Sequence, residues 1–162
     1  MSTNRFVRVI ETLCLHELKY IVVGGVAAVL QRVPINTIDF DIVHDREEEN
    51  VQRLMAALAV LGATYRDESH SLGPTQADLL SAQCHPLRTG RLDLDLMGTL
   101  GEHLDYADLL PDTDKIEVAG YVLDVLKLEK LIEIKRKLTR PKDRFMLIHL
   151  EATLEERERM RD

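Results

Sequence analysis

The sequence lacks any apolar run that approaches the roughly 20 residues needed to span a bilayer. Its first residues, Met1 to Asn4, also lack the basic start and the apolar core of a signal peptide. Cysteine is scarce, since Cys14 and Cys84 are the only two, and no spacing typical of zinc ligands occurs. Two free thiols are therefore favoured over a disulfide or a zinc site, and we expect a cytoplasmic protein that does not enter a membrane.

The sequence also has no excess of basic residues. The 162 residues include 28 acidic and 21 basic side chains, which gives a formal net charge of −7. This charge balance argues against non-specific electrostatic binding of nucleic acid by the whole protein surface. It is still compatible with a local basic patch or a bound metal. With 45% hydrophobic residues the chain can bury one core, so we expect a single domain over residues 1–162, with a core of about 20–126 and a C-terminal helical element of about 127–160.

Hydrophobic periodicity predicts alternating helices and strands. Residues 6–13 and 51–58 have helical spacing, whereas residues 20–23 form a β-branched run that ends at a glycine pair. The segment 91–97 alternates strictly, as a half-buried strand should. Ala119-Gly120 fits the turn of a hairpin over 116–125, and helices are expected from 128 and from 141. Residues 64–88 are the least regular, and strand, loop and a short helix near 76–80 are expected there.

Acidic residues alternate along two of these strands. Thr37, Asp39 and Asp41 should project from one face, with apolar neighbours on the other. Two like charges held close together are unfavourable unless a cation compensates, and Mg²⁺, which binds carboxylate oxygens and substrate phosphates, would do so. Asp93 could supply a third carboxylate on a neighbouring strand, although spacing alone also allows Asp95. The alternative is an edge strand with a solvated acidic face.

Glycines and basic residues offer candidate phosphate contacts. Gly24 and Gly25 lie between a strand and a helix, where backbone N–H groups could approach a triphosphate closely. Lys135 falls on the apolar stripe of its predicted helix, so it either reaches a phosphate or only extends along the apolar surface to water. Arg140 and Lys142 stand at a helix junction, either as contacts to phosphate or base or as solvated charges.

Taken together, five blocks resemble the small nucleotidyltransferase-like proteins of the DNA polymerase β superfamily, close to the minimal nucleotidyltransferases and the AbiEii-type toxins. The blocks are Val23-Gly-Gly-Val-Ala27, Thr37-Ile-Asp-Phe-Asp-Ile42, Thr89-Gly-Arg-Leu-Asp93, Leu128-Glu-Lys-Leu-Ile-Glu-Ile-Lys135 and Arg140-Pro-Lys-Asp143. The resemblance implies an α+β fold, in which helices pack on a short mixed β-sheet and further helices follow at the C-terminus. It also implies that the glycine pair and Thr37 contact the nucleotide, and that Asp39, Asp41 and Asp93 bind Mg²⁺ or Mn²⁺.

The same resemblance implies an activity. The expected reaction moves a nucleoside monophosphate from an NTP to a hydroxyl on RNA such as tRNA, on a protein or on a small molecule, and a toxin–antitoxin role with a cognate antitoxin belongs to this expectation. Gly25 stands where many superfamily members have Ser, and Ile35 where related sequences often have Arg. Two other functions remain open: a non-catalytic nucleotide- or metal-binding module, and an oligomerising role for an apolar helix face.

Overall fold

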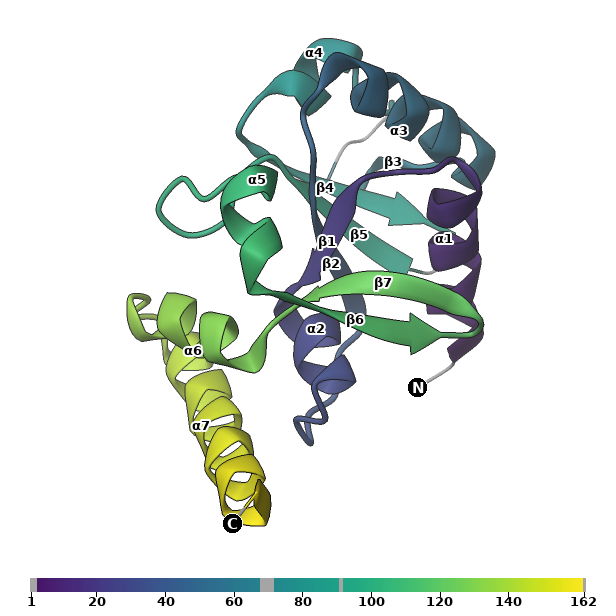
Figure 1. Cartoon of the computed structure of the whole chain (residues 1–162). Coiled ribbons are helices and arrows are strands. Elements are labelled where there is room, and N and C mark those ends of the chain that lie inside the picture. Colours follow the sequence, from purple (N-terminus) through teal and green to yellow (C-terminus); the bar gives the residue numbers. More distant parts are fainter. Residues whose placement is uncertain (1–2, 68–71, 91, 162) are drawn as a thin grey trace.

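A single mixed sheet runs through the centre of the molecule (Figure 1). The structure is a computed structural model that describes residues 3–67, 72–90 and 92–161. Within these residues the sheet has seven strands in the order β3-β4-β5-β2-β1-β7-β6. The strands are β1 (Tyr20–Val23), β2 (Asp39–His44), β3 (Thr64–Tyr65), β4 (Cys84–Thr89), β5 (Leu92–Met97), β6 (Thr113–Val118) and β7 (Tyr121–Leu126).

Helices pack on this sheet and also extend beyond it (Figure 1). They are α1 (Thr3–Leu15), α2 (Gly24–Leu30), α3 (Glu48–Leu61), α4 (Gln76–Leu80), α5 (Tyr106–Leu109), the 3₁₀ turn η1 (Leu110–Asp112), α6 (Leu128–Arg136) and α7 (Pro141–Arg161). The α+β fold that the sequence predicted, a mixed sheet with packed helices and C-terminal helices, is confirmed. No helix in the described ranges is both long and apolar enough to cross a membrane.

The core lies on the apolar side of β2. Phe40 and Ile42 are fully buried, and the Phe6 ring of α1 lies 5.9 Å from the Phe40 ring, centroid to centroid. The α1 stripe that the sequence predicted is therefore the packed face of the helix. Because side chains alternate along a strand, the residues between these core positions face the opposite side of the sheet. That opposite side carries the acidic residues.

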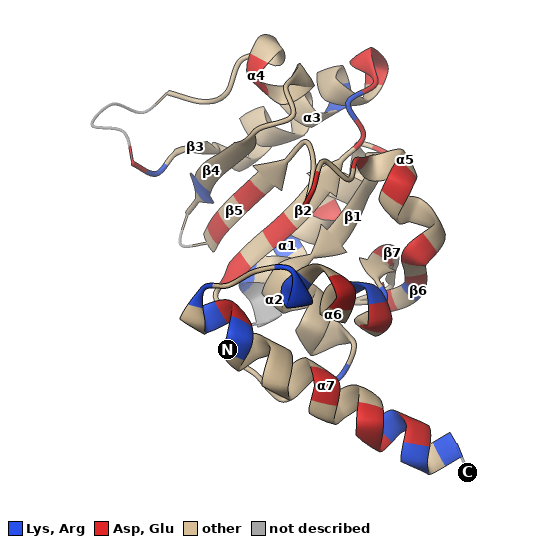
Figure 2. Ribbon diagram, turned by 90° about the vertical axis from the view of Figure 1, so that its left-hand side faces the viewer, with Lys and Arg blue, Asp and Glu red and all other residues tan. Residues whose placement is uncertain are grey.

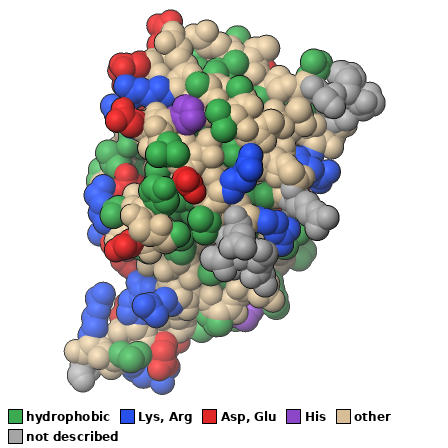
Figure 3. Space-filling model, turned by 90° about the vertical axis from the view of Figure 1, so that its right-hand side faces the viewer, with side chains coloured by type: hydrophobic (Ala, Val, Ile, Leu, Met, Phe, Trp, Pro, Cys, Tyr) green, Lys and Arg blue, Asp and Glu red, His purple; other side chains and the backbone are tan. Residues whose placement is uncertain are grey.

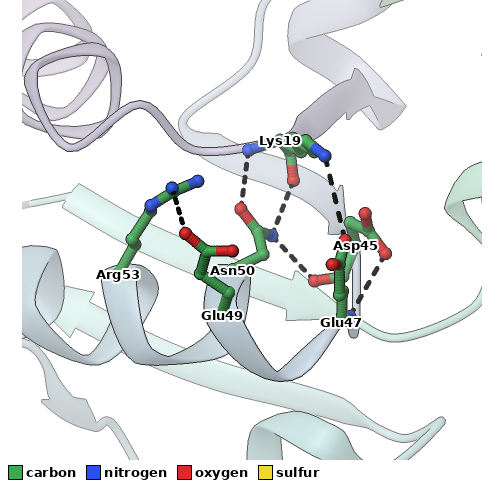
Figure 4. A network of polar contacts seen from close by, with 6 residues as sticks. All are labelled: Lys19, Asp45, Glu47, Glu49, Asn50 and Arg53. Atoms are coloured by element: carbon green, nitrogen blue, oxygen red, sulfur yellow. Dashed lines mark hydrogen bonds and ion pairs between the residues drawn. The ribbon is translucent and has the colours of Figure 1, made fainter.

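A buried asparagine joins the ends of the two central antiparallel strands (Figure 4). The Asn50 side chain accepts a hydrogen bond from Lys19 N at 2.8 Å and donates to Lys19 O at 3.0 Å and to Asp45 O at 2.7 Å. Since Lys19 precedes β1 and Asp45 follows β2, this one side chain of α3 fixes both strand ends. Exposed Glu49 pairs instead with Arg53 on the same helix, so this part of the acidic start of α3 is a solvated helix end.

The least regular segment of the sequence contains strand, as expected, but the bounds of its strands were not predicted. The short helix expected near 76–80 is confirmed as α4, and the hairpin is confirmed with Ala119 and Gly120 both at positive φ, as its tight turn requires. However, β4 spans six residues and pairs along its whole length with β5. The strand predicted from Arg91 begins at Leu92 in the structure, and Arg91 itself lies outside the described residues.

Candidate functional site

Four carboxylates lie side by side on two central strands. The parallel register of β2 and β5 places Asp39 next to Asp93, and Asp41 next to Asp95. Adjacent strands are about 4.8 Å apart, so carboxylates from both strands reach the same space. Figure 2 shows acidic positions in red on the neighbouring strands β2 and β5. We call these four residues the acid row.

Burial and mutual repulsion disfavour the charged form of the acid row. Burial, and then the charge of Asp95, raise the pKa of Asp41 from 3.8 to about 7. Burial, followed by the charges of Asp95 and Asp93, also raises the pKa of Asp39. In addition, the buried Oδ1 of Asp41 has no hydrogen-bond partner. A buried carboxylate oxygen without a donor is unfavourable, and a cation is the kind of ligand that satisfies it.

Two arginines from the neighbouring strands compensate part of this charge. Arg66 Nη1 donates to Asp95 Oδ1 at 2.7 Å and to Leu87 O at 3.0 Å, and Arg66 Nε lies 3.8 Å from Asp93 Oδ2. Arg88 Nε donates to Asp93 Oδ1 at 3.0 Å. Asp93 is thus paired with two arginines and Asp95 with one. Among the described residues, no three Asp, Glu, His or Cys side chains are grouped closely enough to hold a metal ion.

The glycine pair packs directly against the acid row. Gly24 has a φ of +64°, and a Cβ atom there would collide with Asp41 Oδ2. A Cβ atom on Gly25 would lie 2.5 Å from Thr37 Oγ1, which itself donates to Asp39 O at 3.3 Å. Both positions therefore require glycine for close approach, and the first also for its backbone conformation. Thr37 occupies the space that a side chain at position 25 would need.

A cleft of about 360 Å³ connects the acid row with the C-terminal helices. Gly24 and Asp41 line one side, and Lys135, Arg140 and Lys142 line the other. Further lining residues are apolar and come from β5, the loop after it, and α6: Met97, Leu100, Leu131, Ile134 and Leu138. We call this cavity the central cleft. The lining of the cleft thus combines a carboxylate, a glycine turn, basic groups and apolar side chains.

A fully buried carboxylate holds two of the basic groups of the cleft. Asp143 accepts hydrogen bonds from Lys135 Nζ at 2.8 Å and from Arg140 Nε at 2.7 Å, although its side chain has 0% exposure. Burial alone would raise the pKa of Asp143, but the bonds from Lys135 and Arg140 outweigh this and lower it. Sequence analysis missed Asp143 as a site residue. The sequence pattern that could have indicated this role is an acidic residue within a basic block at the start of a helix. An ordinary helix cap has the same pattern, so the pattern alone does not identify a site residue.

The residues predicted from the sequence gather around one centre, with specific differences. The acid row, the glycine pair and Thr37 are in mutual contact or register. Burial raises the pKa of Asp41 and of Asp39, and the charges of Lys135 and Lys142 offset a part of these rises, so both lysines lie within electrostatic reach of the acids. Lys135 does not extend freely to water but pairs with Asp143. The structure also adds Arg66, which sequence reasoning did not connect with the site because β3 and β4 were not resolved as strands.

The fold is similar to that of two solved nucleotidyltransferase structures. One similar solved structure is that of a putative nucleotidyltransferase from Thermotoga maritima, at 20% identity and a TM-score of 0.60, covering 94% of this chain and 92% of the other. Another is ANT(2″)-Ia in complex with adenylyl-2″-tobramycin, at 14% identity and a TM-score of 0.60, covering 94% and 88%. No protein-family model and no curated protein matches the sequence significantly.

Proposed function

We propose that the protein is a metal-dependent nucleotidyltransferase that moves a nucleoside monophosphate from an NTP to a hydroxyl acceptor. The observation that carries this proposal is the register of β2 and β5, which assembles the acid row beside the Gly24 turn. The fold shared with two nucleotidyltransferase structures supports it. In ANT(2″)-Ia the bound adenylyl-2″-tobramycin is such a transfer product, on a small hydroxyl-bearing acceptor.

The central cleft suits an NTP. Lys135, Arg140 and Lys142 supply positive charge for the phosphates, and the apolar wall of α6 and β5 can contact the base. Asp143 fixes Lys135 and Arg140 before the nucleotide arrives, so less conformational freedom is lost on binding. The close approach of Gly24 and Gly25 to the acid row leaves backbone, not side chains, next to the phosphates.

The acid row would hold Mg²⁺ or Mn²⁺. Asp39 and Asp41 fit this role, because neither forms an ion pair among the described residues and Asp41 Oδ1 lacks a partner. The prediction of Asp93 as the third ligand stays a prediction, and the register favours Asp95, which lies beside Asp41 and interacts with it more strongly. When bound, the metal neutralises phosphate charge and lowers the pKa of the attacking hydroxyl.

The reaction itself is a substitution at phosphorus. The acceptor oxygen forms a bond to the α-phosphorus, the bond from that phosphorus to the bridging oxygen breaks, and pyrophosphate leaves with the bonding electrons. The hydroxyl proton passes to a carboxylate of the acid row, for which Asp93 is a candidate, since it lies at the end of the row away from the central cleft. A place among the minimal or AbiEii-type proteins, with a cognate antitoxin as partner, belongs to the same proposal.

A second candidate function is a non-catalytic nucleotide-binding module. Arg66 and Arg88 already neutralise part of the acid row, and no three-residue metal group is assembled among the described residues. A protein that only binds a nucleotide through its basic cleft would tolerate this arrangement. The two functions differ in whether Asp39 and Asp41 are needed for transfer or only influence binding.

The test uses the protein with Mg²⁺ or Mn²⁺ and each NTP labelled at the α-phosphate, alone and with total tRNA or cell lysate. The variant Asp39→Asn/Asp41→Asn should abolish label transfer, whereas the control Glu155→Gln/Glu158→Gln removes the same charge from exposed positions of α7 and should not. Nucleotide binding is measured for all three proteins. Label that survives the Asp39/Asp41 change contradicts the mechanism, and binding without any transfer supports the second function.

A further inference from the structure

The last helix, α7, carries exposed apolar side chains on the face that does not pack on the fold. Figures 1 and 3 show the end of this helix projecting beyond the rest of the molecule. One face of α7 packs inward, since Leu150 is buried. On another face, Phe145 and Ile148 are 65% and 66% exposed, although both are large hydrophobic residues. An apolar face on a helix is normally buried against another element, so these side chains are candidates for contact with a further helix.

The exposed side chains follow the spacing of a coiled-coil seam. Phe145, Ile148 and Ala152 are separated by three and then four residues, and all three are exposed. The same spacing continues to Glu155 and Arg159, so the apolar part is confined to the first half of the helix. We call these five residues the α7 stripe. The small side chain of Ala152 at its centre lets another helix approach closely.

Charges of opposite sign flank the two ends of the α7 stripe. Arg144 lies beside its first residue and Glu158 beside its last; both are exposed, and neither forms an ion pair among the described residues. The two residues are two heptads apart, so they lie on the same side of the stripe. In an antiparallel pair of α7 helices, Arg144 of each copy therefore lies opposite Glu158 of the other. A parallel pair would instead bring Glu151 and Glu156 together, and like charges repel.

We infer that a second copy of this chain covers the α7 stripe, with the two helices antiparallel. A two-fold axis near the middle of the helix packs Ile148 of each copy on Ala152 of the other and places Phe145 opposite Glu155. Such an interface is isologous, because the same surface faces itself. The Phe145 ring already lies 4.9 Å from the His149 ring of its own helix, centroid to centroid, so little side-chain freedom is lost when the copies meet.

A cavity beside the α7 stripe supports an interface on this face. It measures about 610 Å³ and lies between α7 and the segment after α2. Ala152, Glu156 and Met160 line it from α7, and Arg32 and Pro34 line it from the other side. Met160 is 80% exposed although it is apolar. The antiparallel arrangement brings the start of one α7 beside the end of the other, so side chains of the second copy can enter this cavity.

The dimer should be weak. The apolar part of the stripe is short, and glutamate and arginine occupy its second half. An interface of this limited extent belongs to the transient class. We therefore expect a dissociation constant on the order of 100 μM, so unfolding and transfer assays at lower concentrations act on the monomer. The inference does not depend on the proposed function, and its test needs no activity.

The test is sedimentation velocity of the full chain between about 10 μM and 1 mM. The wild-type protein should change from monomer to dimer over this range. Ile148→Glu places a charge in the α7 stripe and should stay monomeric. The matched control Val122→Glu makes the same kind of change at an apolar residue of β7 that is 61% exposed, and it should dimerise like the wild type.

Charge exchange tests the antiparallel arrangement. Arg144→Glu and Glu158→Arg should each weaken dimerisation at least about fivefold, since each leaves like charges opposite one another at both ends of the interface. The double variant Arg144→Glu/Glu158→Arg restores opposite charges, so its dissociation constant should return to within about twofold of the wild-type value. Circular dichroism of every variant checks that the helices are retained.

Three results would each overturn the inference. The wild-type protein could remain monomeric at about 1 mM. Ile148→Glu could dimerise as well as Val122→Glu, which would place any interface elsewhere on the molecule. Finally, the double charge variant could stay as weak as the single variants, which would exclude the pairing of Arg144 with Glu158 of a second copy.

Discussion

Replacing Asp41 by asparagine should stabilise the metal-free protein. Burial and the neighbouring Asp95 raise the pKa of Asp41 from 3.8 to about 7, so the folded chain holds a proton that the unfolded chain releases. At about 1.4 kcal/mol per pH unit, this difference destabilises the fold by about 4 kcal/mol above pH 7. Asparagine has the same shape, carries no charge and can donate to Asp95. Because its amide is also buried, a net gain of about 2–4 kcal/mol is expected.

The pH dependence of this gain distinguishes charge repulsion from improved packing. Since the folded pKa of Asp41 lies above the unfolded value, its penalty is absent below the unfolded pKa, grows as the pH rises, and is complete once the pH exceeds the folded pKa. Urea unfolding in EDTA should therefore show a gain about 2.5 kcal/mol larger at pH 8 than at pH 5. The control Glu158→Gln removes an exposed charge and should change stability by less than about 0.5 kcal/mol. A variant that is less stable than the wild type at pH 8, or a gain independent of pH, would refute the reasoning.

Three further predictions test the contacts around this site. Gly25→Ala should cost about 1–3 kcal/mol in urea unfolding, and combining it with Thr37→Gly should recover part of the loss; additive losses would show that the two residues do not collide. Asp143→Asn should destabilise the protein by about 3 kcal/mol and weaken NTP binding in calorimetry, and unchanged binding would remove its positioning role. Addition of Mg²⁺ should raise the unfolding temperature of the Asp93→Asn variant but not that of the Asp95→Asn variant. The opposite result would assign the third ligand to Asp93.

Local patterns were sufficient to predict the central strands and the main helices. The alternation of acidic and apolar residues in β2 and β5 follows from the two-residue period of a strand. It can therefore be predicted from the sequence alone. The register between those strands is different, because it depends on the pairing of segments that lie about fifty residues apart. The sequence therefore predicted which face carries the acids but could not decide whether Asp93 or Asp95 lies beside Asp41.

There is a physical reason why the bounds of β4 were not predicted. Pro86 interrupts its pattern, and proline is normally excluded from the interior of a sheet because it has no N–H to donate. Here β3 is only two residues long and pairs with Leu87 and Arg88, so Pro86 lies where β4 is almost an edge strand and the missing donor costs little. Without β3 and β4 the position of Arg66 next to the acid row could not be foreseen.

The acid row can exist without metal because positive charge reaches it from two unrelated parts of the fold. Arg66 and Arg88 approach from the sheet, while Lys135 and Lys142 approach from the C-terminal helices. The two sources are not equivalent for a bound cation. The lysines line the central cleft, where Asp143 holds Lys135, whereas Arg66 is bonded to Asp95 itself. Under the proposed mechanism, a metal on Asp95 would compete with Arg66 for Oδ1 or would bind through Oδ2, so we expect Arg66 to influence the affinity for Mg²⁺.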